Sequence, residues 1–260
     1  MVEACYHNRT YLLPSCYNEL SGKQLIKIAP LLAKKEDPAV IQLAVLRILL
    51  KMNRISFFFM PLDPKERLVQ LTEWIYEKNS LTSQLLPKYN GFYGPKTAFD
   101  NITLAEYHCT EIYYSMLVND KKEEALDALI AVLYRKSKNW YNHRLDPDGD
   151  CRKPFNENEI EYWASKIKHW PTQVKQAILL WYDGCRESLI SLYPEVFRPA
   201  PNTDDTGSEK GMFQVMRGLA EGGKYGAFND VKHLNLHTAL MEMEQLVKEA
   251  EEMKKTMPTT

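Results

Sequence analysis

The sequence lacks long apolar runs, an excess of charge of one sign and any uninterrupted stretch that would cross a membrane. Its longest apolar segments, such as residues 177–182, are far shorter than the roughly 18 residues that a membrane-spanning helix needs. The 33 basic and 34 acidic side chains nearly cancel, so no overall field attracts nucleic acid or an anionic membrane. We therefore expect a soluble protein that binds neither membranes nor nucleic acid.

Paired cysteines and an export signal are also missing. The five cysteines are odd in number and scattered along the chain, at Cys5, Cys16, Cys109, Cys151 and Cys185. This usage is typical of reduced intracellular thiols and not of a disulfide framework. The first eleven residues contain charged and polar side chains where an export signal would have an apolar core. A cytoplasmic location follows as the expectation.

No catalytic pattern stands out. A nucleophile elbow, a dinucleotide fingerprint and a paired-cysteine zinc pattern are all absent from the sequence. The segment from Gly218 to Tyr225 approaches the phosphate-loop pattern, with Lys224 at the lysine position. However, Tyr225 replaces the Ser or Thr that would hold magnesium, and the expected preceding element is a helix instead of a strand. We expect a helix stop at these glycines, no cofactor and no enzymatic activity.

Two histidines form the first possible metal site. His233 and His237 are four residues apart on an expected helix, so both imidazoles would lie on one face. A zinc protease would need Glu next to the first histidine, where this chain has Leu234. No third ligand lies at a recognisable spacing, so surface or partner contacts are the expected role.

An acidic loop forms the second possible metal site. Four carboxylates occupy calcium-loop positions one, three, five and twelve, at Asp146, Asp148, Asp150 and Glu157. Cys151 stands where the sharp turn of such a loop requires glycine. An Asp-rich turn without a metal is the preferred interpretation.

The apolar pattern predicts an all-α protein of about eight or nine helices, with minor β structure. Its centre is the stretch from Thr172 to Leu192, where apolar residues recur at steps of four and three. Pro171 near its start and Pro194 beyond its end mark its limits. This helix is expected to be buried among several neighbours, in a helical bundle.

Other helices are predicted from capping patterns. A residue that favours a helix start, namely Ser, Thr, Asp or Asn, stands three residues before Gln or Glu, or directly before Pro, at Ser21, Asp37, Thr103, Asp120 and Asn156. Extended structure is possible at residues 11–13, and as a pair at 83–86 and 96–99. The apolar run 55–59 is compatible with a strand or a helix.

A composition change after Tyr193 predicts three parts. Residues 1–193 would form the helical core domain, and the Pro-rich polar segment 194–210 would be a linker. Residues 211–260 would form a C-terminal helical pair: a short helix closed by Gly222 and Gly223, and a last helix from Asp230 to about Lys255. That last helix carries several methionines beside a leucine stripe, which suits binding to varied helical partners. Docking back onto the chain's own body is the alternative.

Several segments of the chain match patterns of a known family. The opening LLPSCYNELSGKQLIKIAPLL resembles an aromatic-Asn-Glu-Leu-Thr pattern followed by Lys-Gln-Leu. Further similar segments are NITLAEYHCTE, AVLYR, DCRKPFNENEI and GLAEGGKYGAFNDVKHLNLHTALMEMEQL. With these segments the chain resembles the phage tail assembly chaperones, a family encoded beside tail genes in bacteriophages and prophages. The chain departs from the pattern at Cys16 and at Ser21, where Thr is usual.

The resemblance implies a non-enzymatic helper in the bacterial cytoplasm that binds the apolar, helical tape measure protein during tail assembly. The residues expected to contact this partner are Met212, Phe213, Met216, Leu236, Leu240, Met243 and Val247. Two other functions stay open. One is a structural component of the virion or tail, and the other is a small helical metal-binding protein or enzyme that uses the acidic loop or the two histidines.

Overall fold

The computed structural model describes residues 1–6, 9–34, 36–142, 149–198, 216–221 and 223–256. The chain is mainly helical, as predicted, with two small β hairpins. Within the described residues, no helix combines the length and hydropathy that crossing a membrane requires. The chain divides into two compact units, and each unit is built from two separate stretches of sequence.

Unit 1 comprises Met1–Leu86 and Trp170–Glu187, and unit 2 comprises Pro87–His169 and Ser188–Thr260. Most of the predicted linker, residues 199–210, lies outside the described residues. The predicted boundaries at 193 and 211 therefore stay a prediction.

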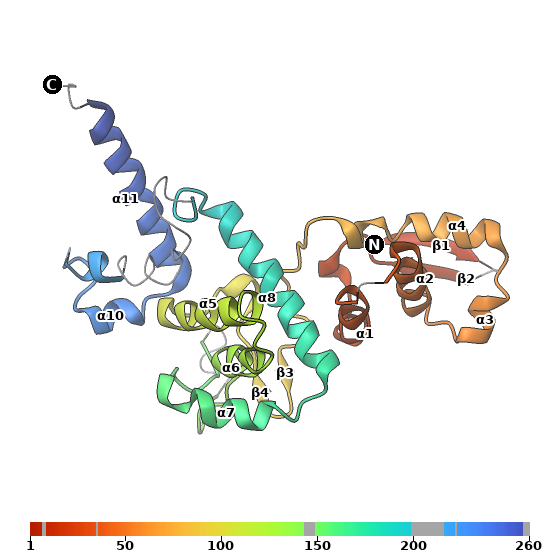
Figure 1. Ribbon diagram of the computed structural model, residues 1–260, viewed down its shortest axis with the longest axis horizontal. Coiled ribbons are helices and arrows are strands. Elements are labelled where there is room, and N and C mark those ends of the chain that lie inside the picture. The colour runs from red at the N-terminus through yellow and green to blue at the C-terminus, as the bar shows by residue number, and fades with distance from the viewer. Residues whose placement is uncertain (7–8, 35, 143–148, 199–215, 222, 257–260) are drawn as a thin grey trace. The chain divides into compact units, whose positions relative to one another are not determined.

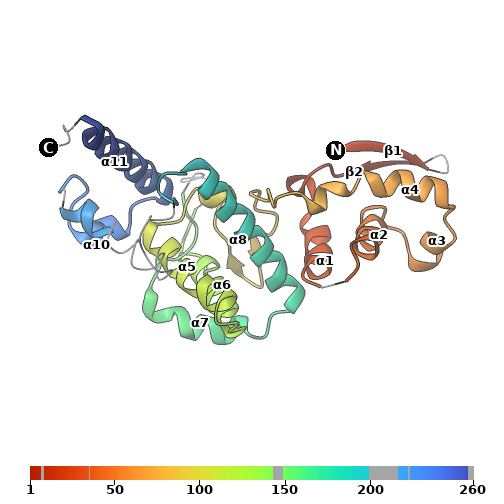
Figure 2. The same ribbon diagram turned by 45° about the horizontal axis from the view of Figure 1, so that its top comes forward.

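Unit 1 begins with a β hairpin. Strands β1 (Val2–Tyr6) and β2 (Arg9–Leu13) are antiparallel, with Val2 opposite Leu13. The extended structure expected at residues 11–13 is thus the second half of β2. The hairpin runs alongside helix α4 (Leu62–Gln70) in both ribbon views (Figure 1 and Figure 2).

Local capping sets the first helices. α1 (Gly22–Leu32) starts with the predicted capping box, in which the Gln24 amide donates to Ser21 Oγ at 3.3 Å and the Ser21 amide donates to Gln24 Oε1 at 2.8 Å. α2 (Pro38–Leu49) starts where the Asp37 carboxylate accepts from the Ala39 amide at 2.8 Å. Both predicted starts are confirmed, because caps depend only on neighbours in sequence.

The apolar run 55–59 is helical, so the strand alternative was wrong. Helix α3 (Arg54–Phe58) begins at Asn53, whose side chain accepts from the Ser56 amide at 2.7 Å. Phe57 and Met60 are buried. After α4, a 3₁₀ turn, η2 (Glu73–Tyr76), leads into the long loop.

The loop of residues 79–101 holds the second hairpin, which belongs to unit 2. Strands β3 (Lys88–Tyr89) and β4 (Phe92–Tyr93) pair antiparallel. Asn90 and Gly91 between them have φ of 47° and 74°, as the two central residues of a type I′ turn require. The extended pair expected at 83–86 and 96–99 was wrong, because the Asn-Gly turn sets a tighter register.

Helix α8 (Thr172–Leu192) has the predicted bounds. Its contacts in unit 1 are made to the extended segment 78–82. The Asn79 side chain donates to the Leu180 carbonyl at 2.7 Å, and the Trp181 indole donates to the Thr82 carbonyl at 3.0 Å. Val174, Ile178 and Trp181 are buried, as the apolar spacing predicted.

In unit 2, α5 (Leu104–Val118), α6 (Glu124–Leu133) and α7 (Ile160–Ile167) pack together, as both ribbon views show. The Thr103 cap is confirmed, because the Glu106 amide donates to its hydroxyl at 3.2 Å. The Asp120 box was wrong: α6 starts at Glu124, and Asp120 pairs with Lys122 at 3.2 Å. Short 3₁₀ turns, η3 (Thr97–Phe99) and η4 (Glu157–Glu159), precede α5 and α7.

The C-terminal region has two helices where one was predicted from residue 230 to 255. α10 (Phe228–Lys232) and α11 (Leu236–Thr256) are separated by residues 233–235. The break has a long-range cause. The Leu104 amide donates to the Leu234 carbonyl and the Leu236 amide donates to the Ile102 carbonyl, both at 2.9 Å. These bonds hold residues 234–236 extended against the start of α5. Residues 216–221 are also helical.

Candidate functional site

A groove of about 400 Å³ lies on unit 1. Side chains of α2, α3 and α4 line it. The apolar ones include Leu43, Phe57 and Phe58, and the charged ones are Arg47, Arg54 and Lys65. We call this hollow the unit 1 groove. Its size lies within the range of about 300–1,000 Å³ that is typical of ligand pockets.

An exposed apolar row adjoins the unit 1 groove. Ile55, Phe58, Phe59 and Leu62 are exposed to 71%, 77%, 76% and 69%. Ile55 and Phe58 lie on α3, which buries Phe57, whereas Phe59 follows the end of α3 and Leu62 begins α4. The rings of Phe58 and Phe59 lie edge to face with centroids 5.4 Å apart. Large apolar side chains gathered in this way on a surface are typical of interaction sites.

The unit 1 groove is positively charged. Its lining includes no acidic residue, and within the described part of the chain no ion pair involves Arg47, Arg54 or Lys65. The Lys65 ammonium lies 5.3 Å from the centroid of the Phe57 ring, a cation–π contact. An occupant with both apolar and anionic groups would therefore match the groove.

None of the described residues that were predicted to bind a partner lines the unit 1 groove. Met216, Leu236, Leu240 and Met243 are buried within the chain, and Val247 is half-buried. Met212 and Phe213 lie outside the described residues. Partner binding through this set stays a prediction, and through the buried Leu236, Leu240 and Met243 it would require α11 to leave the body of unit 2.

Polar contacts hold α11 where it starts. Ala98 offers a carbonyl to His237 Nε2 at 2.8 Å, so this nitrogen carries the proton, and Nδ1 lies 3.1 Å from the Tyr193 hydroxyl. About two turns further on, Glu244 Oε2 accepts from the Glu195 and Val196 amides, at 3.1 and 3.2 Å. The expected pair of histidines on one helix face was wrong, because His233 lies at the end of α10.

The acidic loop is only partly described. Asp146 and Asp148 lie outside the described residues, while Asp150 binds Arg152 and Glu157 pairs with Lys232 at 3.3 Å. Among the described residues, no group of three or more His, Cys, Asp and Glu side chains is arranged to hold a metal ion.

Unit 2 instead contains a buried charge cluster, formed by Glu106, Arg135, Asp150 and Arg152. Arg135 Nη2 lies 3.0 Å from Glu106 Oε1, and Arg152 Nη2 lies 3.3 Å from Glu106 Oε2 and 2.8 Å from Asp150 Oδ2. Glu106, Arg135 and Arg152 are almost fully buried. Three segments of unit 2, at 101–111, 131–135 and 150–160, thus meet at this cluster.

The charge cluster also ends helix α6. Arg135 Nη1 donates to the Val132 carbonyl and Arg152 Nη1 donates to the Leu133 carbonyl, both at 2.9 Å. The last carbonyls of a helix have no partner within it, so these guanidinium groups satisfy them. Burial, and then the neighbouring Arg152, lower the pKa of Arg135, while Glu106 opposes this shift. Two positive and two negative groups balance, which indicates a structural role.

Sequence reasoning missed this charge cluster. A signal was available, because Arg135 directly follows the apolar run of α6, and Glu106 lies in an apolar stretch. Charged side chains at such positions are seldom buried without partners. What the sequence does not supply is which charges meet.

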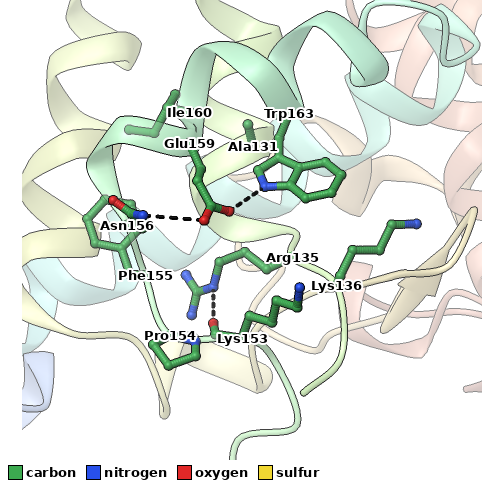
Figure 3. A pocket seen from close by; sticks show the side chains of 10 residues that line it. All are labelled: Ala131, Arg135, Lys136, Lys153, Pro154, Phe155, Asn156, Glu159, Ile160 and Trp163. Atoms are coloured by element: carbon green, nitrogen blue, oxygen red, sulfur yellow. Dashed lines mark hydrogen bonds between the residues drawn. The ribbon is translucent and has the colours of Figure 1, made fainter. Parts of the chain in front are cut away.

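A small cavity lies beside Arg135 of the charge cluster (Figure 3). Phe155 also lines it, and Glu159 accepts hydrogen bonds from Asn156 and Trp163 at 3.3 and 2.9 Å. Its volume of about 20 Å³ suits a single water molecule. It is too small for a substrate, so the unit 1 groove is the better candidate.

The glycine-rich segment near Lys224 is engaged within the chain. The Lys224 ammonium binds the Glu242 carboxylate at 2.5 Å. Gly223 has a φ of 68° and follows the helical residues 216–221, which is typical of a glycine helix end.

Comparison with known proteins identified no relative: no protein-family model matches the chain, and neither does any curated protein or solved structure.

Proposed function

We propose that this chain is a non-enzymatic helper that binds apolar helical segments of another protein, namely the tape measure protein during phage tail assembly. The general part of the proposal rests on one observation, the exposed row of Ile55, Phe58, Phe59 and Leu62 beside the unit 1 groove. The choice of a tail protein as partner rests on the family resemblance alone.

The surface that such a helper would cover is the apolar stripe of an unassembled helix. An unassembled long helix with an apolar stripe tends to aggregate, and a partner with a matching apolar groove covers that stripe reversibly. Aromatic side chains give large contact areas at low entropic cost, and they are enriched at binding hot spots. The exposed row and groove offer such a surface without any rearrangement of unit 1.

The test is co-production of the chain with a tape measure protein, followed by measurement of the soluble fraction of that protein. We expect the chain to raise this fraction, and the double variant Ile55→Ser, Phe59→Ser to abolish the increase. Val118→Ser is the matched control, because Val118 is also an exposed apolar residue but lies on α5. The double variant Met212→Ser, Phe213→Ser tests the C-terminal residues predicted from the sequence.

Two results would count against the proposal. An unchanged soluble fraction in the presence of the chain would remove the helper function. A rise that survives Ile55→Ser, Phe59→Ser but is lost with Met212→Ser, Phe213→Ser would move the binding site to the C-terminal region.

A further inference from the structure

We propose that the unit 1 groove binds helix α11 of a second copy of this chain, so that the protein associates with itself through two different surfaces. The proposal uses the same groove as the proposed function, with α11 in the place of a partner helix. It is tested with the purified chain alone, so it can fail without affecting the proposed function, and the reverse also holds.

The second half of α11 has an exposed acidic and apolar side. Leu246, Glu249 and Met253 follow one another at steps of three and four, which places them on one face of the helix. Leu246 and Met253 are exposed to 48% and 62%, and Glu249 and Glu252 are exposed as well. The buried side of α11, with Leu240 and Met243, is a different face.

Charge and shape of the two surfaces are complementary. The unit 1 groove offers three cations around apolar side chains, and the exposed side of α11 offers carboxylates around Leu246 and Met253. An amphipathic helix laid into an apolar groove is a recurring mode of recognition. Opposite charges across such a contact select the partner and its orientation.

A helix fits the surface better than a small ligand. The exposed row continues the apolar lining beyond the groove, through Ile55, Phe59 and Leu62. A molecule confined to the groove would leave this row in water. The helical stretch from Leu246 to Met253 rises by about 10 Å at 1.5 Å per residue, so its apolar side chains can cover both.

The two surfaces are different, so each contact joins the groove of one copy to α11 of another. A copy with a damaged groove still offers its α11, and a copy with a damaged α11 still offers its groove. Complementation between two defective variants is therefore expected.

The experiment measures the mass of the full chain by analytical ultracentrifugation over a range of concentrations. We expect mass above that of one copy at high concentration, and weaker association at high salt, because salt screens exposed charges. Arg54→Glu and Glu249→Arg should each weaken association by about tenfold, since each places like charges together. An equimolar mixture of the two variants should associate more strongly than either alone, because the intact groove of the Glu249→Arg variant then meets the intact α11 of the Arg54→Glu variant.

Lys23→Glu is the matched control, because it makes the same charge change on exposed Lys23 of α1, outside the groove. It should associate like the natural chain. Circular dichroism melting checks that each variant is folded, and Phe58→Ser replaces Arg54→Glu if that variant is not.

Three outcomes would overturn the proposal. One is a single-copy mass at every concentration. Another is association that both charge reversals leave unchanged, which would place the interface elsewhere. The third is a mixture of the two variants that associates no more strongly than either variant alone, which would show that the groove does not bind α11.

Discussion

Burial decides what individual polar residues of this protein can do. Arg152 is fully buried and donates to Asp150, the Leu133 carbonyl and the Asn101 carbonyl, so its guanidinium joins three segments of unit 2. Removal of one partner from such a buried group leaves the others uncompensated in a medium of low dielectric constant. The charge cluster is therefore better understood as a structural joint than as a reactive centre.

Cys109 on α5 is the residue for which burial makes the sharpest chemical prediction. Burial, followed by the charge of Glu157, raises the pKa of the Cys109 thiol to about 11. At about pH 8.5 only about 0.3% of such a thiol is ionised, whereas half of an ordinary thiol is. The thiolate of a thiol with a high pKa is more nucleophilic, but this recovers only part of the lost labelling rate. We expect iodoacetamide to label Cys109 about tenfold more slowly in the folded chain than in urea, as measured by mass spectrometry.

The exposed Cys5 is the control for this labelling experiment, because its labelling rate should change little on unfolding. Equal labelling rates of Cys109 in the folded and unfolded chain would contradict the expected protection.

The same pKa shift of Cys109 predicts a stability effect. The unfolded thiol ionises near its ordinary pKa of about 8.5, so the stabilisation is complete below that pH and is lost as the pH rises through about 11. Cys109→Ala should therefore make the free energy of unfolding less dependent on pH in this range.

At the scale of elements, the bounds of most helices depend on neighbouring residues, whereas the contacts between helices depend on residues far apart in sequence. α8 has the predicted bounds because apolar spacing and flanking prolines are properties of neighbouring residues. The division between α10 and α11 was missed, because it depends on backbone bonds to Ile102 and Leu104, more than a hundred residues away in sequence.

Gly184 in α8 tests how closely this helix packs on the segment 78–82. A Cβ atom at Gly184 would lie 2.4 Å from the Leu81 carbonyl oxygen and 2.8 Å from the Leu81 amide nitrogen. Both are backbone atoms that cannot rotate away, so we expect Gly184→Ala to destabilise the chain by about 2 kcal/mol, within the range for overpacking. Differential scanning calorimetry measures the effect.

Gly218→Ala provides the matched control, because a Cβ atom there would meet nothing within 4 Å. In the helical residues 216–221, alanine in place of glycine is expected to be neutral or to stabilise by up to about 1 kcal/mol. Equal melting temperatures of Gly184→Ala and Gly218→Ala would show that the contact between Gly184 and Leu81 is not tight.

At the scale of the whole molecule, neither unit is a continuous stretch of chain. Unit 2 is completed by residues after 188, which return to cover the start of α5. A chain cut after Tyr193 therefore loses part of its fold as well as any binding site, so loss of partner capture by that fragment alone would be ambiguous.

We expect the chain truncated after Tyr193 to be strongly destabilised. Leu236, Leu240 and Met243 are buried, and burial of each such side chain contributes about 1.5–3 kcal/mol. Their combined loss is comparable to the whole stability of a typical domain, about 5–15 kcal/mol. Melting curves and binding of the dye ANS, which reports exposed apolar surface, measure the effect.

Truncation after Lys248 is the control. It keeps every buried apolar residue of α11 named above and removes the exposed Met253. This shorter deletion should leave melting and ANS binding nearly unchanged. A chain ending at Tyr193 that melts cooperatively and binds no ANS would contradict the role assigned to α11.

The sequence by itself determined the mainly helical class, the bounds of α8 and the capped starts of α1, α2 and α5, because caps, proline and apolar period act between near neighbours. Only the tertiary structure decided that Glu106, Arg135 and Arg152 meet, that one face of α11 is buried, and that the apolar row beside the unit 1 groove is left exposed. Those outcomes depend on contacts between residues far apart in the chain, and the pattern of a single segment does not encode which distant surface it will meet.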